Sequence, residues 1–284
     1  MKRRAARLAL AALAGLALWP ESGARADGPL SAGPVQQAAI FEDDDSREMT
    51  RAERARYGAV GVIRSTRLGY RAQAMAVVVL RPNLAVTTAH VLYGERGLPR
   101  APLDTWQVVL ADGDGGTAAH PVTEVRIGSR YPELAPWADW AVLLLANPAG
   151  PHIVPLDLPP ADAPPPAVAD MPVVQVGYRG YFDADFTYRL DDCRLRQPGA
   201  LNPLRIQAGA RIHDCDTEAG ESGSPLIVTT DGRDILIGVH AGDYRSLAWD
   251  GDGFEPSFNF NYAIAPEGEM LQAILELAGA AAPR

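Results

Sequence analysis

Lysine, cysteine and long apolar runs are all scarce in this chain of 284 residues. Lys2 is the only lysine and the formal net charge is −9, so the chain lacks the basic surface that a general nucleic-acid binder requires. Two cysteines are too few for a disulfide-dense miniature scaffold or a four-cysteine zinc site. The hydrophobic fraction of 47% is nevertheless sufficient for a substantial core, which excludes a wholly disordered chain and indicates one large or two small domains.

Residues 1–26 have the three-part pattern of a secretory signal. Basic residues precede the apolar run Leu8–Trp19, and Ala24-Arg25-Ala26 offers small residues before a cut at Asp27. The alternative is a membrane anchor, but this run is shorter than the roughly 20 residues that cross a bilayer. We therefore expect export to the periplasm or the medium, with no membrane attachment after cleavage. Removal of five basic residues and one acid would leave a net charge of −13.

The pattern of apolar runs and turn residues in the remaining chain predicts strands in two halves. Residues 27–56 are polar and charged, which indicates a pro-segment or an N-terminal arm lying over a core. Residues 57–154 and 173–265 contain short apolar runs bounded by Gly, Pro, Asp and Asn, and their regular recurrence predicts barrels or a sandwich. The clearest runs are Met75–Leu80, Trp106–Leu110, Ala141–Leu145, Val173–Gly177, Leu226–Val228 and Ile235–Val239.

Two other segments differ from these halves. Residues 155–172 are rich in proline, which excludes a helix interior or a central strand and predicts an extended connector. Residues 266–284 carry apolar residues at helical spacing after Pro266, which predicts one helix with proline in its first turn, followed by a tail. In an oxidising compartment we expect Cys193 and Cys215 to form a disulfide rather than remain as two buried thiols.

Three short segments supply candidate reactive groups. An apolar strand ends at His90, Asp139 stands at the start of a very apolar strand, and Ser222 lies between glycines. Singly, each has an ordinary structural interpretation. Together they supply the base, the orienting acid and the nucleophile that hydrolysis by a serine needs. The flanking glycines let the Gly220 and Ser222 amides converge on one oxyanion.

The order of these motifs is specific. With T-A-H ending at His90, D-x-A-V-L starting at Asp139 and G-x-S-G-S-P around Ser222, the chain resembles the trypsin/chymotrypsin-like serine peptidases over residues 57–265. Subtilisins and α/β-hydrolases have other orders. The resemblance implies an all-β fold of two six-stranded antiparallel barrels, with His90 and Asp139 on the first barrel and Ser222 on the second.

The resemblance also implies a reaction. His90 would be the general base, Asp139 its orienting partner and Ser222 the nucleophile, with the Gly220 and Ser222 amides as the oxyanion hole. Peptide bonds of a peptide or protein substrate would be cut through an acyl-enzyme, without metal or organic cofactor. A bridge to Cys193 would anchor the start of the nucleophile loop at Cys215. We expect a monomer.

The sequence leaves the residue preference open between two interpretations. Asp216 stands six residues before Ser222, where trypsin-like enzymes carry the acid that binds Arg or Lys. Thr217, with His240 in a G-V-H-A-G strand, instead resembles the glutamyl endopeptidases, in which these residue types bind an acidic side chain. We favour a preference for Glu or Asp, because the histidine-bearing strand is the rarer feature and G-S-P fits the bacterial glutamyl group.

Several positions depart from the animal enzymes. Ala241 replaces a serine that supports the catalytic aspartate, and Glu221 replaces the aspartate that receives a new N-terminus on activation. Residues 39–47 resemble the N-terminal region of the glutamyl group, whose free amine can complete the pocket. A cut near Ala39 is therefore a hypothesis. The alternative from another class is a catalytically silent protease-fold protein that binds peptides.

The remaining candidates have simpler explanations. Two Asp-Gly-Asp-Gly segments, starting at Asp112 and Asp250, lack the closing glutamate of a calcium loop, and turn chemistry explains both. His120, His152 and His213 have no ligand-like spacing, so we expect them to be structural or exposed.

Overall fold

The computed structural model describes residues 39–68, 73–132, 134–160, 170–179, 187–204, 209–247 and 249–279. The expected signal at residues 1–26 and the beginning of the arm lie outside this part of the chain. Within it, no helix has the length and apolar character needed to span a bilayer.

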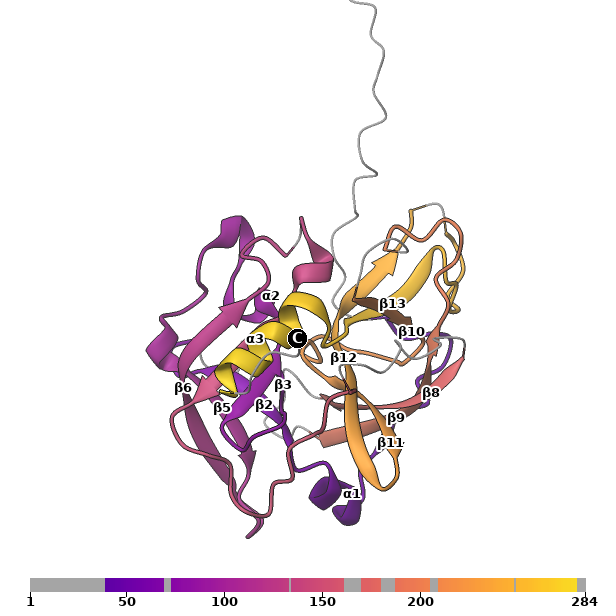
Figure 1. Cartoon of the computed structure of the whole chain (residues 1–284). Coiled ribbons are helices and arrows are strands. Elements are labelled where there is room, and N and C mark those ends of the chain that lie inside the picture. Colours follow the sequence, from indigo (N-terminus) through magenta and orange to yellow (C-terminus); the bar gives the residue numbers. More distant parts are fainter. Residues whose placement is uncertain are drawn as a thin grey trace, which may run out of the picture. The chain divides into compact units, whose positions relative to one another are not determined.

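The first half of the chain closes into a six-stranded antiparallel barrel (Figure 1, indigo to magenta). Its order is β2-β3-β4-β7-β6-β5, so the last strand pairs with the first. Burial alternates along β5, while every residue of β7 is apolar and almost all are buried. The strands are β2 (Val60–Ser65), β3 (Gln73–Val78), β4 (Leu84–Thr87), β5 (Trp106–Ala111), β6 (Thr117–Ile127) and β7 (Ala141–Leu145).

The second half forms another closed barrel beside the first (Figure 1, salmon to light orange). Its order is β8-β9-β10-β13-β12-β11, and β11 returns to β8. The expected fold of two six-stranded antiparallel barrels is therefore confirmed. The strands are β8 (Met171–Arg179), β9 (Thr187–Arg196), β10 (Ala210–His213), β11 (Pro225–Thr230), β12 (Arg233–Arg245) and β13 (Asn259–Ile264).

Two boundaries differ from the sequence prediction. Strand β8 begins inside the proline-rich segment, and Pro172 pairs with β9. Proline is tolerated there because β11 joins β8 only from Val174 onward, so no second ladder needs an N–H from Pro172. The C-terminal helix α3 (Gly268–Leu277) is present, but Pro266 precedes its N-cap, Glu267, instead of lying in its first turn.

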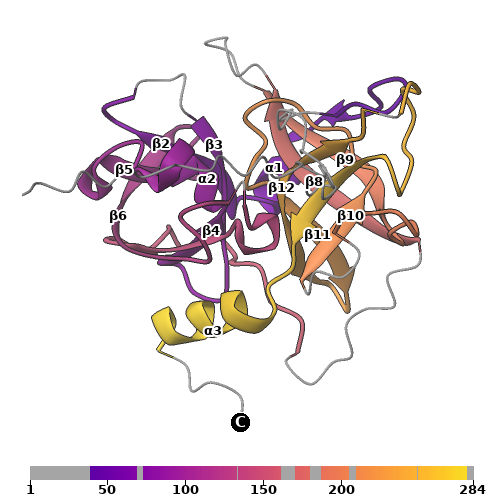
Figure 2. The same ribbon diagram turned by 90° about the horizontal axis from the view of Figure 1, so that it is seen from above.

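The described segments at the two ends of the chain each contact the barrel that is farther away in the sequence. In the arm, strand β1 (Arg47–Glu48) pairs with β9 of the second barrel. Helix α1 (Arg51–Arg56) follows, with a capping box formed by Thr50 and Glu53. At the other end, α3 leaves the second barrel and packs against β7 of the first (Figure 2).

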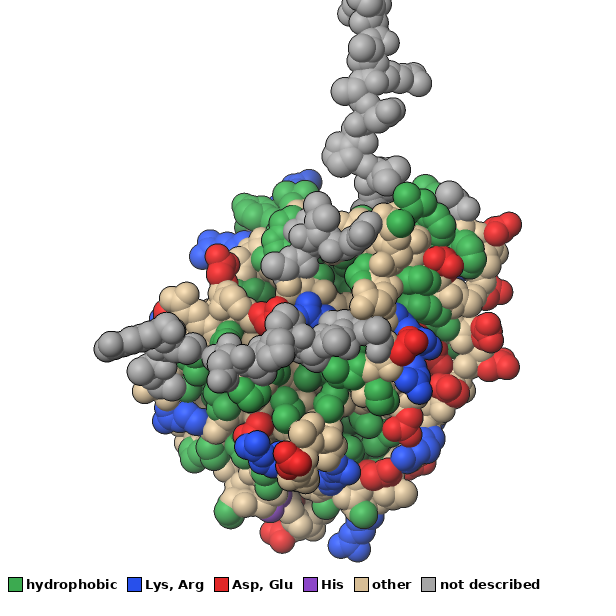
Figure 3. Space-filling model, turned by 45° about the vertical axis from the view of Figure 1, so that its right-hand side comes forward, with side chains coloured by type: hydrophobic (Ala, Val, Ile, Leu, Met, Phe, Trp, Pro, Cys, Tyr) green, Lys and Arg blue, Asp and Glu red, His purple; other side chains and the backbone are tan. Residues whose placement is uncertain are grey.

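Apolar packing joins the barrels into one core. The main buried cluster contains β3 and β7 side chains of the first barrel together with Tyr178, Phe260 and other residues of the second. A smaller cluster surrounds Cys193 and Cys215. On the surface, Arg side chains lie scattered among Asp and Glu, which gather along the right-hand edge of the face in Figure 3. The negative net charge is thus not offset on this face by a continuous basic surface.

Candidate active site

The structure brings His90, Asp139 and Ser222 together between the barrels. His90 Nδ1 lies 2.6 Å from Asp139 Oδ2, and the His90 backbone amide donates to Asp139 Oδ1 at 2.9 Å. On the other side of the ring, His90 Nε2 lies 2.8 Å from Ser222 Oγ. One correction concerns His90. It is the second residue of the short helix α2 (Ala89–Leu92), which follows β4, and is not the end of the strand itself.

Backbone hydrogen bonds fix Ser222 between the two barrels. Its carbonyl accepts from the Met75 amide on β3 at 2.7 Å, and the hydroxyl of Thr87 donates to the Met75 carbonyl at 2.7 Å. The amide of Gly223 donates to the His240 carbonyl on β12 at 2.8 Å. The nucleophile candidate is therefore held in register with the barrel that carries His90.

The turn before Ser222 leaves two backbone donors available. Gly220 has φ of +99°, a conformation that glycine adopts without the steric cost of a side chain. Within the described part of the chain, neither the Gly220 amide nor the Ser222 amide donates a hydrogen bond. Both N–H groups thus remain for an oxygen that becomes negatively charged during a reaction.

The predicted specificity residue His240 belongs to a buried pair of histidines. His240 on β12 and His213 at the end of β10 are fully buried, with His213 Nε2 3.1 Å from His240 Nδ1. Burial lowers the pKa of His240 to about 3, with a smaller contribution from His90, and burial also lowers the pKa of His213 well below its usual range. Both rings are therefore neutral at neutral pH. The sequence analysis expected His213 only to be structural or exposed, so it missed both the full burial of this residue and its partnership with His240.

Thr217 and Asp216 hold the N-terminal arm. Thr217 exchanges hydrogen bonds with Ala39, whose amide lies 3.3 Å from the threonine hydroxyl. Asp216 accepts from the Phe41 amide at 2.8 Å through Oδ1 and from the Asp45 amide at 3.2 Å through Oδ2. Burial raises the pKa of Asp216. Both oxygens of Asp216 are thus engaged by the arm, not directed to a bound cation as the Arg/Lys alternative requires.

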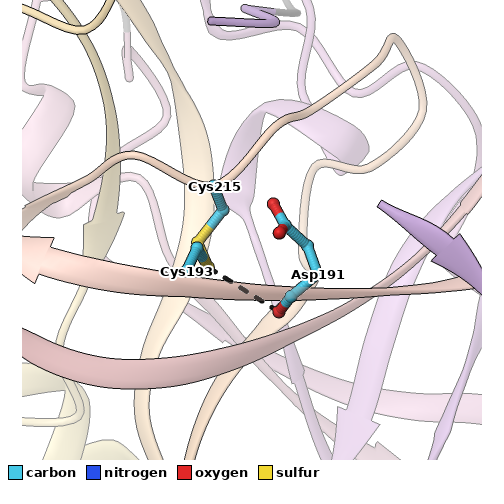
Figure 4. Close-up of side chains that lie close together, drawn as sticks. All are labelled: Asp191, Cys193 and Cys215. Atoms are coloured by element: carbon cyan, nitrogen blue, oxygen red, sulfur yellow. Dashed lines mark hydrogen bonds between the residues drawn. A yellow bond between two sulfur atoms is a disulfide. The ribbon is translucent and has the colours of Figure 1, made fainter. Parts of the chain in front are cut away.

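Cys193 and Cys215 are joined in the expected disulfide (Figure 4). The bridge links β9 to the segment that leads to Ser222. Asp191 lies beside it, but disulfide sulfurs are not thiolate metal ligands. Asp45, Asp191 and Asp216 could each offer a cation one oxygen, since their carboxylates lie within 4.8 Å of one another.

Other candidate groups have local structural roles. Asp112 accepts the amides of Asp114 and Gly116 at 3.0 and 2.8 Å, which is the turn chemistry expected of that segment. His120 and His152 contact backbone carbonyls, as expected of structural or exposed histidines.

The family model described as Trypsin matches residues 53–263, which include the first barrel and all of the second except the last residue of β13. No curated protein matches the chain.

Proposed function

The chain belongs to the trypsin family, and we propose that it is an active serine endopeptidase with His90, Asp139 and Ser222 as its triad. The observation that carries the proposal is the continuous hydrogen-bonded path from Asp139 through His90 to Ser222 Oγ. A non-catalytic protein has no need of this geometry.

The reaction follows from these contacts. His90 Nε2 takes the proton of Ser222 Oγ as this oxygen attacks the peptide carbonyl carbon, and Asp139 stabilises the imidazolium that forms. The Gly220 and Ser222 amides stabilise the resulting oxyanion. His90 then gives its proton to the leaving amine as the C–N bond breaks. Water, activated by His90, hydrolyses the acyl-enzyme and restores the Ser222 hydroxyl.

A fluorophosphonate probe tests the proposal, because it labels only an activated serine. We expect labelling of the processed protein, none of Ser222→Ala, and normal labelling of the control Ser65→Ala on β2. A correctly folded wild-type protein that is not labelled would support the alternative, a silent peptide-binding protein.

We further propose that the enzyme prefers Glu or Asp before the cut. His240 is neutral, so it can bind a carboxylate only by donating an N–H. If His213 Nε2 carries a proton and donates to His240 Nδ1, the proton of His240 must sit on Nε2. That buried Nε2 has no hydrogen-bond partner within the described residues, so it is a donor that the protein itself leaves unsatisfied. His213 would thus set the tautomer of His240.

Matched peptides that differ only in the residue before the cut test this preference. We expect Glu to be cleaved faster than Gln, its neutral isostere, and much faster than Arg. His213→Leu removes the donor and should raise KM for the Glu peptide, whereas His213→Gln retains an N–H and should retain part of the preference. A preference for Arg would refute this argument and would support the alternative, in which Asp216 binds the basic side chain of the substrate. Because the protein is acidic, added salt should favour the Glu peptide.

We also propose export through residues 1–26 and a second cut near Ala39. The contact of the Ala39 amide with Thr217 supports the second cut, because a chain that began at Ala39 would place its amine beside the specificity residues. N-terminal sequencing of the active form tests both cuts. A fully active protein that begins at Asp27 would refute a requirement for the second cut.

A further inference from the structure

Three acidic side chains converge where the N-terminal arm meets the second barrel. Asp45 comes from the arm, Asp191 from β9, and Asp216 from the segment that leads to Ser222. One carboxylate oxygen of each lies within 4.8 Å of the other two. Two ligands of one calcium ion, each at about 2.3–2.6 Å from it, can be no more than about 5 Å apart. The three oxygens are therefore close enough to bind the same ion.

No basic side chain forms an ion pair with this cluster within the described part of the chain. Asp191 and Asp216 are 5% and 4% exposed. The three arginines of β9 have other acceptors: Arg189 contacts Asp44, Arg194 the Asp170 carbonyl, and Arg196 both Asp170 and Asp214. Buried carboxylates that lack a basic partner either take up protons or bind a metal ion. The cluster therefore needs a positive charge that these arginines do not supply.

A buried amide without a partner lies beside the same cluster. Gln175 on β8 is 2% exposed, and neither its Nε2 nor its Oε1 has a hydrogen-bond partner within the described residues. It pairs directly with Asp191 in the β8–β9 ladder. Side chains of such a pair leave the sheet on the same face, with Cβ atoms about 5 Å apart. On β9 this face also carries Cys193, which packs in a buried cluster beside Asp191 (Figure 4). Because calcium binds amide oxygens, Gln175 Oε1 is a fourth candidate ligand.

We propose that the three carboxylates and the Gln175 amide oxygen bind a calcium ion, which fastens the N-terminal arm to the second barrel. Calcium accepts roughly six to eight oxygen ligands in a flexible arrangement, whereas magnesium keeps more of its waters. The oxygens of Asp216 have further lone pairs, so they can bind the ion while they accept the two amides of the arm. Asp45 and Asp191 also line a surface pocket of about 720 Å³, through which an ion and its waters can enter.

Titration calorimetry with calcium chloride, on protein first freed of metal with EDTA, tests the site. We expect a Kd of about 10⁻³ M or tighter, the range of extracellular calcium modules, and a Tm that rises with the calcium concentration. Asp45→Asn and Asp191→Asn should each weaken binding about tenfold or more, because ligand charge sets the affinity of such sites. Asp192→Asn is the matched control, since Asp192 is the exposed neighbour on β9, and should bind as wild type does.

Two further measurements separate a ligand from a merely structural residue. In EDTA at high pH, Asp191→Asn should have a higher Tm than wild type, because it removes a buried charge. Added calcium should raise the Tm of wild type more than that of this variant, because the variant lacks a ligand. Gln175→Met fills similar space without an amide oxygen. Calcium should slow hydrogen exchange at the Asp45 amide in wild type and do so less in Gln175→Met.

The inference is independent of the proposed peptidase activity, because calcium binding is measured without substrate. Absence of labelling by the fluorophosphonate would refute the peptidase alone. Absence of both heat and a Tm change with calcium would refute the site. An equal response to magnesium, or an equal loss in Asp192→Asn, would indicate general screening of the acidic surface and would refute it as well. Wild-type affinity in Gln175→Met would refute the role of Gln175. If that variant does not fold, Asp45→Asn decides the question, because Asp45 is exposed and its substitution leaves the core intact.

Discussion

Asp191 on β9 is a buried carboxylic acid that lies near other acidic side chains. Its replacement by the neutral residue asparagine should stabilise the protein at high pH. Asp191 is 5% exposed. Burial raises its pKa to about 7, the Asp216 amide lowers it in part, and Asp45, Asp216 and Asp214 raise it further. Asp191→Asn removes the titratable proton but keeps an oxygen that can accept the Asp216 amide, which lies 2.6 Å from Asp191 Oδ2.

The sign follows from proton binding in the two states. The ordinary pKa of Asp191 is 3.8, so between about pH 4 and pH 7 the native protein binds more protons than the unfolded chain. Stability therefore falls as the pH rises through this window. The difference of roughly three pH units, at 1.36 kcal/mol each, sets an upper bound of about 4 kcal/mol on the cost at pH 8.

Urea unfolding at pH 4, 6 and 8 measures this cost. Asp191→Asn should match wild type at pH 4 and become progressively more stable than wild type up to pH 8. Asp192→Asn is the matched control, because Asp192 is the exposed neighbour on the same strand and should show no such trend. A pH-independent difference, or a variant that is less stable at pH 8, would refute the reasoning.

Two further predictions concern the same side of the second barrel. Replacement of Cys193 and Cys215 by alanine should lower the free energy of unfolding by about 3 kcal/mol, the chain-entropy value for their separation of 22 residues, as measured by denaturant unfolding. Asp216→Asn replaces one of the two carboxylate oxygens that accept hydrogen bonds from the backbone amides of the arm. Hydrogen exchange at Phe41 or Asp45 should quicken about fivefold, since one hydrogen bond contributes about 1 kcal/mol, and unchanged exchange would contradict the anchoring role.

Much of the fold could be predicted because its signals are local. The short apolar runs with turn residues between them predicted strands in two halves, and all six quoted runs overlap strands. The closure of the strands into two six-stranded barrels was implied by the family resemblance. Helix α1 was missed, although Thr50 and Glu53 have the spacing of a capping box in the sequence. The position of His90 in α2 was not visible, because four residues are too few to establish a helical period.

The contacts that depend on strand register could not be predicted. His213 and His240 are 27 residues apart, and they meet because β10 and β12 both pair with β13. Asp216 was assigned to a pocket from its distance to Ser222 in the sequence. Its partner Phe41 lies 175 residues earlier, and only the path of the arm brings the two together.

The exchange of terminal segments between the barrels has a thermodynamic consequence. The arm before the first barrel is bonded to the second, and α3 after the second barrel is packed on the first. Loss of either barrel therefore removes contacts from the segment attached to the other. Unfolding should be a single cooperative transition, in which the measured free energy belongs to the pair and neither barrel has a stability of its own.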